Sequence, residues 1–104
     1  MIVEYIRYQI KPGEIAAFLK GYEEACGVLR NSPHCMEYDL SQCVDEPTQL
    51  ILRIHWDSVE GHLKGFRTSP DFPRFFSPIR PWVGSIQEMR HYESTPIFFR
   101  RSGA

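Results

Sequence analysis

A single histidine stands on an otherwise apolar helical stripe. Val59, His62, Leu63 and Phe66 recur at spacings of three and four residues, the pattern of one helical face. An imidazole in such surroundings can take the proton of a phenolic hydroxyl near neutral pH. We therefore consider His62 a candidate catalytic base. The alternative is a structural histidine that donates a hydrogen bond to a strand carbonyl.

A tryptophan ends the strand that precedes this stripe. Between residues 48 and 56 the chain alternates in the period-two pattern of a pleated strand, with Leu50, Leu52, Ile54 and Trp56 on one side. Trp56 and His62 are then expected to flank the mouth of one pocket. Trp56 is the second candidate catalytic-site residue, as a wall for a planar aromatic substrate, although a large aromatic residue here also suits an ordinary core.

Further aromatic residues are candidates for lining an apolar cleft between sheet and helices, the kind of site that binds a flat ligand. Core packing is the alternative explanation for most of them. The candidate substrate-binding residues are Tyr8, Tyr38, Phe66, Phe72, Phe76 and Trp82. By alternation His55 and Arg53 face away from this cleft, and His34 and His91 are expected to be exposed.

The elements that must position these residues follow the order strand, helix, strand, strand, helix, strand. Strands are expected over residues 2–10, 34–44, 48–56 and 83–93, and an amphipathic helix over 14–30. A second helix begins near Asp57 and is interrupted at Pro70, and a loop over 77–82 precedes the last strand. This order predicts an α+β protein with a ferredoxin-like βαββαβ sandwich, an antiparallel sheet covered by helices on one face.

The uncovered face of the sheet predicts a partner. Tyr5, Arg7, Ile51, Arg53 and His55 would lie on it, so a homodimer joined sheet to sheet is the simplest expectation. We expect one domain over residues 1–93 and a carboxyl tail over 94–104, which would add an edge strand, reach across to the other subunit or remain disordered.

Composition narrows the class of protein. With 104 residues and a formal net charge of −1, the sequence is expected to form a single domain without the basic surface typical of nucleic-acid binding. A soluble cytoplasmic protein without a membrane partner is expected, since no apolar run approaches the length of a spanning helix. Cys26, Cys35 and Cys43 are expected to be free thiols, and no metal site is expected because zinc-binding spacings are absent.

Several short motifs occur in order along roughly residues 2–93. The first motifs are Pro12-Gly13, Cys35 to Leu40 as CMEYDL, and Asp45-Glu46-Pro47. Trp56-Asp57-Ser58 and Ser69 to Phe72 as SPDF follow them. This order resembles the antibiotic biosynthesis monooxygenase family over the same range. The runs Ile79 to Gly84 and Glu88 to Tyr92 look especially similar to the small domain of this family found beside truncated haemoglobins.

The resemblance implies a dimeric α+β barrel and a cofactor-independent oxidation of quinols or anthrones by dioxygen. Other members degrade haem with an asparagine, a tryptophan and a histidine; Trp56 matches the tryptophan, but Phe66 stands at the histidine position and the first strand has no asparagine. Many members carry a helix histidine where this chain has Gly65, so His62 is offset from it. A non-catalytic small-ligand-binding or interaction domain, with haem as one candidate ligand, is therefore the alternative function.

Overall fold

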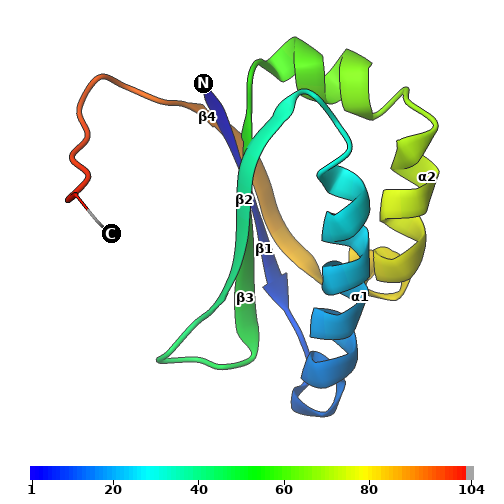
Figure 1. The fold of residues 1–104 in the computed structure, drawn as a ribbon. Coiled ribbons are helices and arrows are strands. Elements are labelled where there is room, and N and C mark those ends of the chain that lie inside the picture. The colour runs from blue at the N-terminus through cyan, green and yellow to red at the C-terminus, as the bar shows by residue number, and fades with distance from the viewer. Residues whose placement is uncertain (103–104) are drawn as a thin grey trace.

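A computed structural model describes residues 1–102 as a four-stranded antiparallel sheet with helices on one face (Figure 1). The strands are β1 (Ile2–Gln9), β2 (Cys35–Gln42), β3 (Gln49–Trp56) and β4 (Ile86–Glu93), in the order β2-β3-β1-β4. The helices are α1 (Ile15–Leu29), α2 (Asp71–Phe76), the 3₁₀ segments η1 (Pro12–Glu14) and η3 (Ser77–Ser85), and the π-helical η2 (Gly61–Phe66). The predicted ferredoxin-like α+β fold is confirmed.

The core lies between the sheet and the helices. On β3 the inward row is almost fully buried, and on α1 the inward stripe consists of Phe18, Tyr22, Ala25, Cys26 and Leu29. Burial of such side chains stabilises the fold by roughly 1.5–3 kcal/mol each. The two layers therefore hold β1 and β3 rigidly in the register that pairs Ile2 with Trp56 and Glu4 with Ile54.

The second helical region differs from the expected α-helix. Its backbone is π-helical, because the Arg67 N–H donates to the His62 carbonyl five residues earlier at 3.1 Å. His62 and Phe66 are buried, whereas Val59 and Leu63 are 40% and 42% exposed. The predicted four-residue apolar face was therefore wrong for Val59 and Leu63: the wider turn directs only His62 and Phe66 toward the sheet.

The region before the last strand also differs from the prediction. Residues 77–82, expected as a loop, belong to the 3₁₀ segment η3, so β4 begins at Ile86 instead of Val83. Two prolines, Pro78 and Pro81, lie in η3. Proline has no backbone N–H, so in a β-strand each would remove a hydrogen bond between strands, whereas the 3₁₀ segment accommodates both.

The carboxyl tail leaves the sheet after β4 and runs away from the helical layer (Figure 1). The Ser94 N–H donates to the Met1 carbonyl at 2.9 Å, and the exposed residues Ile97, Phe98 and Phe99 follow without forming a strand. A crossing of the tail to another subunit stays a prediction, and its last two residues, 103 and 104, lie outside the described residues. Within residues 1–102 no helix has the length and apolarity to span a membrane.

Candidate active site

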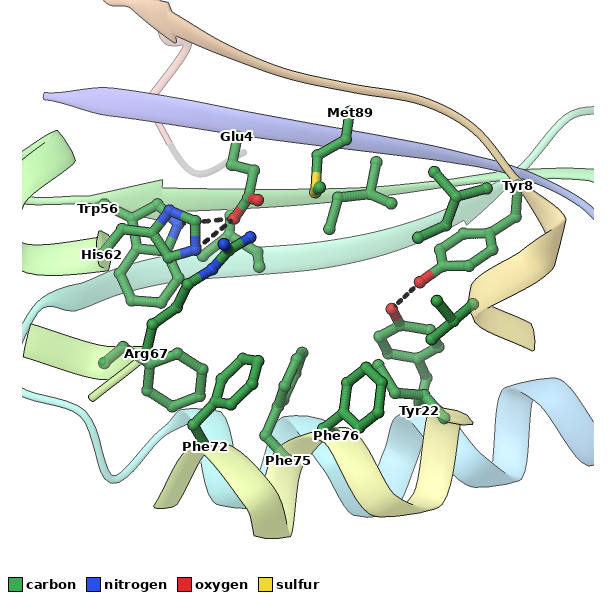
Figure 2. A pocket seen from close by; sticks show the side chains of 16 residues that line it. Glu4, Tyr8, Tyr22, Trp56, His62, Arg67, Phe72, Phe75, Phe76 and Met89 are labelled. Carbon is green, nitrogen blue, oxygen red and sulfur yellow. Dashed lines mark hydrogen bonds and ion pairs between the residues drawn. The ribbon is translucent and has the colours of Figure 1, made fainter. Parts of the chain in front are cut away.

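A cavity of about 150 Å³ lies between the sheet and the helices that cover it (Figure 2). Its walls are aromatic and aliphatic except for a few polar groups, the composition of a site for a small organic ligand. The strands contribute Glu4, Ile6, Tyr8, Ile54, Trp56, Ile86 and Met89. The helical side and the residue after η2 contribute Tyr22, His62, Phe66, Arg67, Phe72, Phe75, Phe76, Ile79 and Val83.

The structure brings most of the sequence-predicted site residues to this cavity. Trp56 and His62 lie side by side in its wall, as the strand and helix patterns predicted. The four predicted aromatic residues that also line it are Tyr8, Phe66, Phe72 and Phe76.

Two predicted residues lie elsewhere. Tyr38 is on the edge strand β2, where its hydroxyl accepts a hydrogen bond from Arg30 Nε at 2.7 Å. Trp82 packs edge-on against Phe18 with ring centroids 5.5 Å apart, on the part of α1 away from the cavity lining. Both predictions rest on aromatic character, which does not reveal how far along the sheet a residue lies.

The rings of Trp56 and His62 stack with centroids 4.6 Å apart and an interplanar angle of 17°. This contact arises because β3 ends at Trp56 and the chain turns through Asp57 and Ser58 back over the sheet into η2. The Phe66 ring also contacts the indole, at 5.4 Å. The stack covers one side of the imidazole.

A buried carboxylate that sequence patterns had not singled out lies against this stack. Glu4 is 2% exposed, and its Oε1 accepts a hydrogen bond from Trp56 Nε1 at 3.0 Å. His62 Nε2 lies 3.5 Å from the same oxygen. The alternation of β1 contained the signal, since Glu4 interrupts the inward row of Ile2, Ile6 and Tyr8.

A second histidine completes this polar end of the cavity. His91 is directly opposite Glu4 in the pairing of β1 with β4, and its Nε2 lies 2.8 Å from His62 Nδ1. The His91 side chain is 29% exposed, so it contacts the site and also reaches solvent, as predicted. Arg67, just beyond η2, extends its guanidinium toward Glu4 and His62 (Figure 2).

Burial sets the acid–base properties of this cluster. It lowers the pKa of His62 to about 4, with smaller contributions in the same direction from the charges of His91 and Arg67, so the imidazole is neutral at pH 7. Burial raises the pKa of Glu4, an effect that the Trp56 hydrogen bond and the electrostatic interactions with His91 and Arg67 partly oppose. Relative to the same groups in water, burial therefore makes Glu4 a stronger base and His62 a weaker one.

Two tyrosines provide polar groups at the other end of the cavity. The hydroxyls of Tyr8 and Tyr22 hydrogen-bond to each other (Figure 2). Burial is the main cause that raises the pKa of Tyr8 to about 12 and raises that of Tyr22 further. Both phenols therefore stay protonated at neutral pH and can hydrogen-bond an oxygen of a bound ligand.

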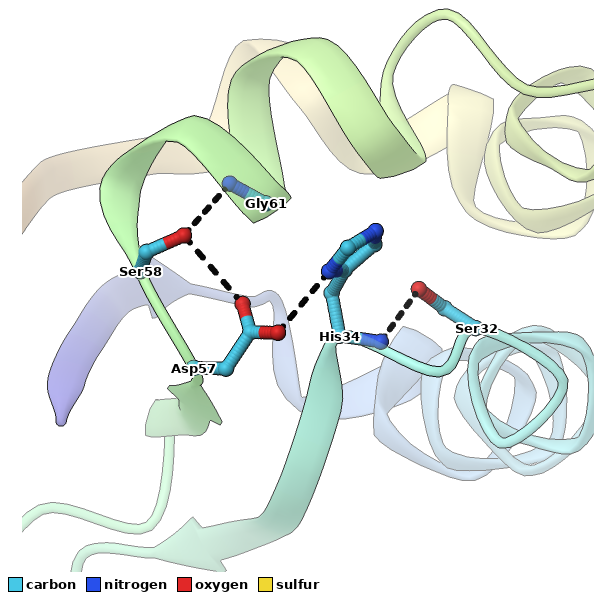
Figure 3. Close-up of polar contacts among 5 residues, drawn as sticks. All are labelled: Ser32, His34, Asp57, Ser58 and Gly61. Carbon is cyan, nitrogen blue, oxygen red and sulfur yellow. Dashed lines mark hydrogen bonds and ion pairs between the residues drawn. The ribbon is translucent and has the colours of Figure 1, made fainter.

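A separate histidine and carboxylate fix the entry of η2 (Figure 3). His34 Nδ1 lies 2.9 Å from Asp57 Oδ2, the Asp57 N–H donates to the His34 carbonyl at 2.9 Å, and the Gly61 N–H donates to Ser58 Oγ at 2.8 Å. A Cβ added at Gly61 or Gly65 would overlap the His34 ring. His34 thus occupies the side-chain space that Gly65 leaves empty. His62 is the histidine of η2 that lines the cavity.

Comparisons with known proteins place the chain in a family. Residues 1–77 match the family described as antibiotic biosynthesis monooxygenase. YczJ of Bacillus subtilis strain 168, an uncharacterized protein, is 26% identical over 96 residues, which is 86% of this chain and 100% of its own length.

Solved structures share the fold at low sequence identity. A Bordetella bronchiseptica protein described as an antibiotic biosynthesis monooxygenase is 23% identical, with a TM-score of 0.75 over 90% of this chain and 96% of its own. A variant of SnoaB, a cofactor-independent oxygenase from Streptomyces nogalater, is 11% identical, with a TM-score of 0.75 over 92% of this chain and 94% of its own. The family match covers well over half of the sequence, and the chain belongs to the antibiotic biosynthesis monooxygenase family.

Proposed function

We propose that this protein is a cofactor-independent monooxygenase that oxidises an aromatic quinol- or anthrone-like substrate with dioxygen. The observation that carries the proposal is the Glu4 and His62 pair, which is 2% and 5% exposed and lies at one end of an apolar, aromatic-lined cavity. A base held in such surroundings can deprotonate a weakly acidic hydroxyl, and the apolar walls exclude water from the resulting anion.

Glu4 is the proton acceptor in this proposal, and His62 positions it. Glu4 Oε1 is held by Trp56 Nε1 at 3.0 Å and faces His62 Nε2 at 3.5 Å, whereas Oε2 is 3.8 Å from His91 Nε2, beyond hydrogen-bond distance. Oε2 is therefore the atom available to a substrate hydroxyl. This assignment moves the basic atom from His62, the base expected from sequence, to its buried partner, because burial strengthens a carboxylate as a base and weakens an imidazole.

The remaining groups of the cavity orient the ring. A substrate hydroxyl at Glu4 places the ring between Trp56 and the phenylalanines of α2, and a second oxygen reaches toward the Tyr8 and Tyr22 hydroxyls. Arg67 supplies a positive charge near the anion that deprotonation creates. The site thus holds both ends of a quinol.

The overall reaction balances without another electron donor. A quinol gives up four electrons to dioxygen; one oxygen atom forms a bond to a ring carbon, and the other leaves as water with two protons. The product is a hydroxylated quinone. The ring anion is the electron donor, so removal of the hydroxyl proton is the step that the protein must assist.

The volume of the cavity favours a small substrate. A closed apolar cavity of about 150 Å³ accommodates one benzene ring, and the cavity found here has the same size. We therefore rank one-ring hydroquinols above two-ring quinols and three-ring anthrones as substrates.

We also propose a cytoplasmic homodimer that packs through the uncovered sheet face. On that face Tyr5 and Tyr92 pack edge to face at 5.4 Å, and Arg53 pairs with Asp39 at 2.6 Å. His55 Nε2 is buried without a hydrogen-bond partner in the described part of the chain, and a second subunit would supply one. The three cysteines are free, as expected, which suits a reducing compartment.

Light scattering during size-exclusion chromatography tests the dimer. Ile51→Glu, which places a charge on the uncovered face, is expected to give monomers, and Leu63→Glu on the exposed surface of η2 is the matched control that stays dimeric. A monomeric wild-type protein at micromolar concentration would contradict the dimer.

Oxygen uptake tests the oxygenase. Purified protein, treated with chelator, is supplied with one-ring hydroquinols, two-ring quinols and anthrones, and oxygen consumption and product are measured together. We expect one oxygen molecule consumed per hydroxyquinone formed, with Glu4→Gln far slower. Ligand binding without oxygen uptake across the whole panel would instead support the non-catalytic binding domain.

A further inference from the structure

We propose that Glu4, His62 and His91 form a binding site for a divalent transition-metal ion, with Zn²⁺ as its first-choice occupant. The three side chains come from β1, η2 and β4, and their potential ligand atoms all lie within 4.8 Å of one another. Two imidazoles and one carboxylate are a common ligand set for zinc and for non-haem iron.

The distances fit an ion after small side-chain rotations. Ligand bonds of about 2.1 Å place neighbouring ligand atoms roughly 3.0–3.4 Å apart. His91 Nε2 is 2.8 Å from His62 Nδ1 and 3.8 Å from Glu4 Oε2, values on either side of that range.

The surroundings support the ligands in the way that metal sites require. A carboxylate that binds a metal ion is usually hydrogen-bonded in turn by a neighbouring donor. One oxygen of Glu4, Oε1, is held in this way. Trp56 Nε1 donates to that same oxygen, which leaves Oε2 for the ion.

Charge and access favour a cation here. The Glu4 carboxylate is 2% exposed, and buried carboxylates are normally paired with a cation or bound to a metal. His91, whose side chain is 29% exposed, provides the entry path from solvent. The ion and the substrate would compete for Glu4 Oε2, so metal binding would inhibit the oxygenase; this inhibition, unlike the binding itself, rests on the proposed function.

Titration without substrate tests the site directly. Tag-free protein, stripped with chelator, is titrated with Co²⁺ while visible absorption is recorded, and with Zn²⁺ in a calorimeter. We expect one ion per chain and a d–d absorption band typical of nitrogen and oxygen ligands. His91→Gln is expected to weaken binding by at least roughly tenfold, because loss of a second-shell partner alone costs about 10–100-fold.

Two controls make the result specific. His55→Gln, at a histidine that also lies near a carboxylate but faces away from the cavity, is expected to leave the Zn²⁺ affinity unchanged. Mg²⁺ is expected to bind much more weakly, since it prefers oxygen ligands. Absence of Co²⁺ binding, equal binding by His91→Gln, or Mg²⁺ binding as tight as Zn²⁺ would each overturn the proposal, whatever the outcome with oxygen and quinols.

Discussion

Two histidine–carboxylate pairs in this molecule have nearly the same components and opposite properties. Glu4 and His62 are 2% and 5% exposed at the wall of the cavity, whereas Asp57 and His34 are 41% and 37% exposed at the entry of η2. Burial raises the pKa of Glu4 and lowers that of His62; at the exposed pair, the His34 hydrogen bond lowers the pKa of Asp57. Solvent access, and not residue type, separates a candidate base from a structural contact.

The residues around the two pairs also differ. The buried pair contacts the Trp56 indole and the His91 ring and opens on an apolar cavity, so its groups are available to a ligand. The exposed pair joins the start of β2 to the end of β3, and the His34 ring covers Gly61 and Gly65. We therefore expect the first pair to control chemistry and the second to hold η2 in place.

The largest expected difference between the pairs is in catalysis. Glu4→Gln keeps the size of the side chain but removes the base, and oxygen uptake with the best hydroquinol is expected to fall roughly 10²–10⁴-fold. Asp57→Asn is the matched change at the exposed pair and is expected to alter the rate by less than about twofold, since exposed ion pairs contribute little. Similar losses in the two variants would break the comparison.

A smaller effect is expected in the pH dependence of stability. The pKa of His62 is about 4 in the folded protein against an ordinary 6.5, so the unfolded chain takes up the proton first as the pH falls. The free energy of unfolding therefore loses a contribution on the order of 3 kcal/mol as the pH falls through this window. The lowered pKa of Asp57 affects stability only at lower pH, near and below the ordinary carboxyl pKa of 3.8.

Urea unfolding at a series of pH values measures this contribution. The raised pKa of Glu4 makes the folded protein more stable as the pH falls, which would mask the effect of His62. We therefore compare Glu4→Gln with the double variant Glu4→Gln/His62→Gln, so that only His62 differs. The double variant is expected to lose less stability than Glu4→Gln as the pH falls from 6.5 to 4. Parallel curves would show that His62 is not held neutral by burial.

The smallest effect concerns the contact between His34 and Gly65. A Cβ at Gly65 overlaps the His34 ring, so Gly65→Ala alone must displace that ring from Asp57. In a His34→Ala background the overlap is gone, and Gly65→Ala is expected to stabilise the helix by up to about 1 kcal/mol. A double-mutant cycle from thermal unfolding checks this coupling, and additive effects would remove His34 as the reason for the glycine.

Much of the fold followed from periodicity, but the site followed only in part. Alternation along β3 placed Trp56 inward, and the helical spacing placed His62 beside it, because these patterns depend on local geometry. The π-helical turn escaped prediction, since the Arg67 to His62 hydrogen bond leaves no residue-type signature. Glu4 was visible as a charge in an inward row, whereas its approach to His91 depends on pairing between residues far apart in the chain.

The account rests most directly on the buried pair accepting a proton from an aromatic hydroxyl. Binding of 4-nitrophenol, followed by its absorption at a pH below its own pKa, reports this transfer without dioxygen. Wild-type protein is expected to bind it with the spectrum of the phenolate, and Glu4→Gln to bind it with the spectrum of the neutral phenol. A neutral spectrum in the wild-type protein, or phenolate in both, would contradict the assignment of Glu4 as the base.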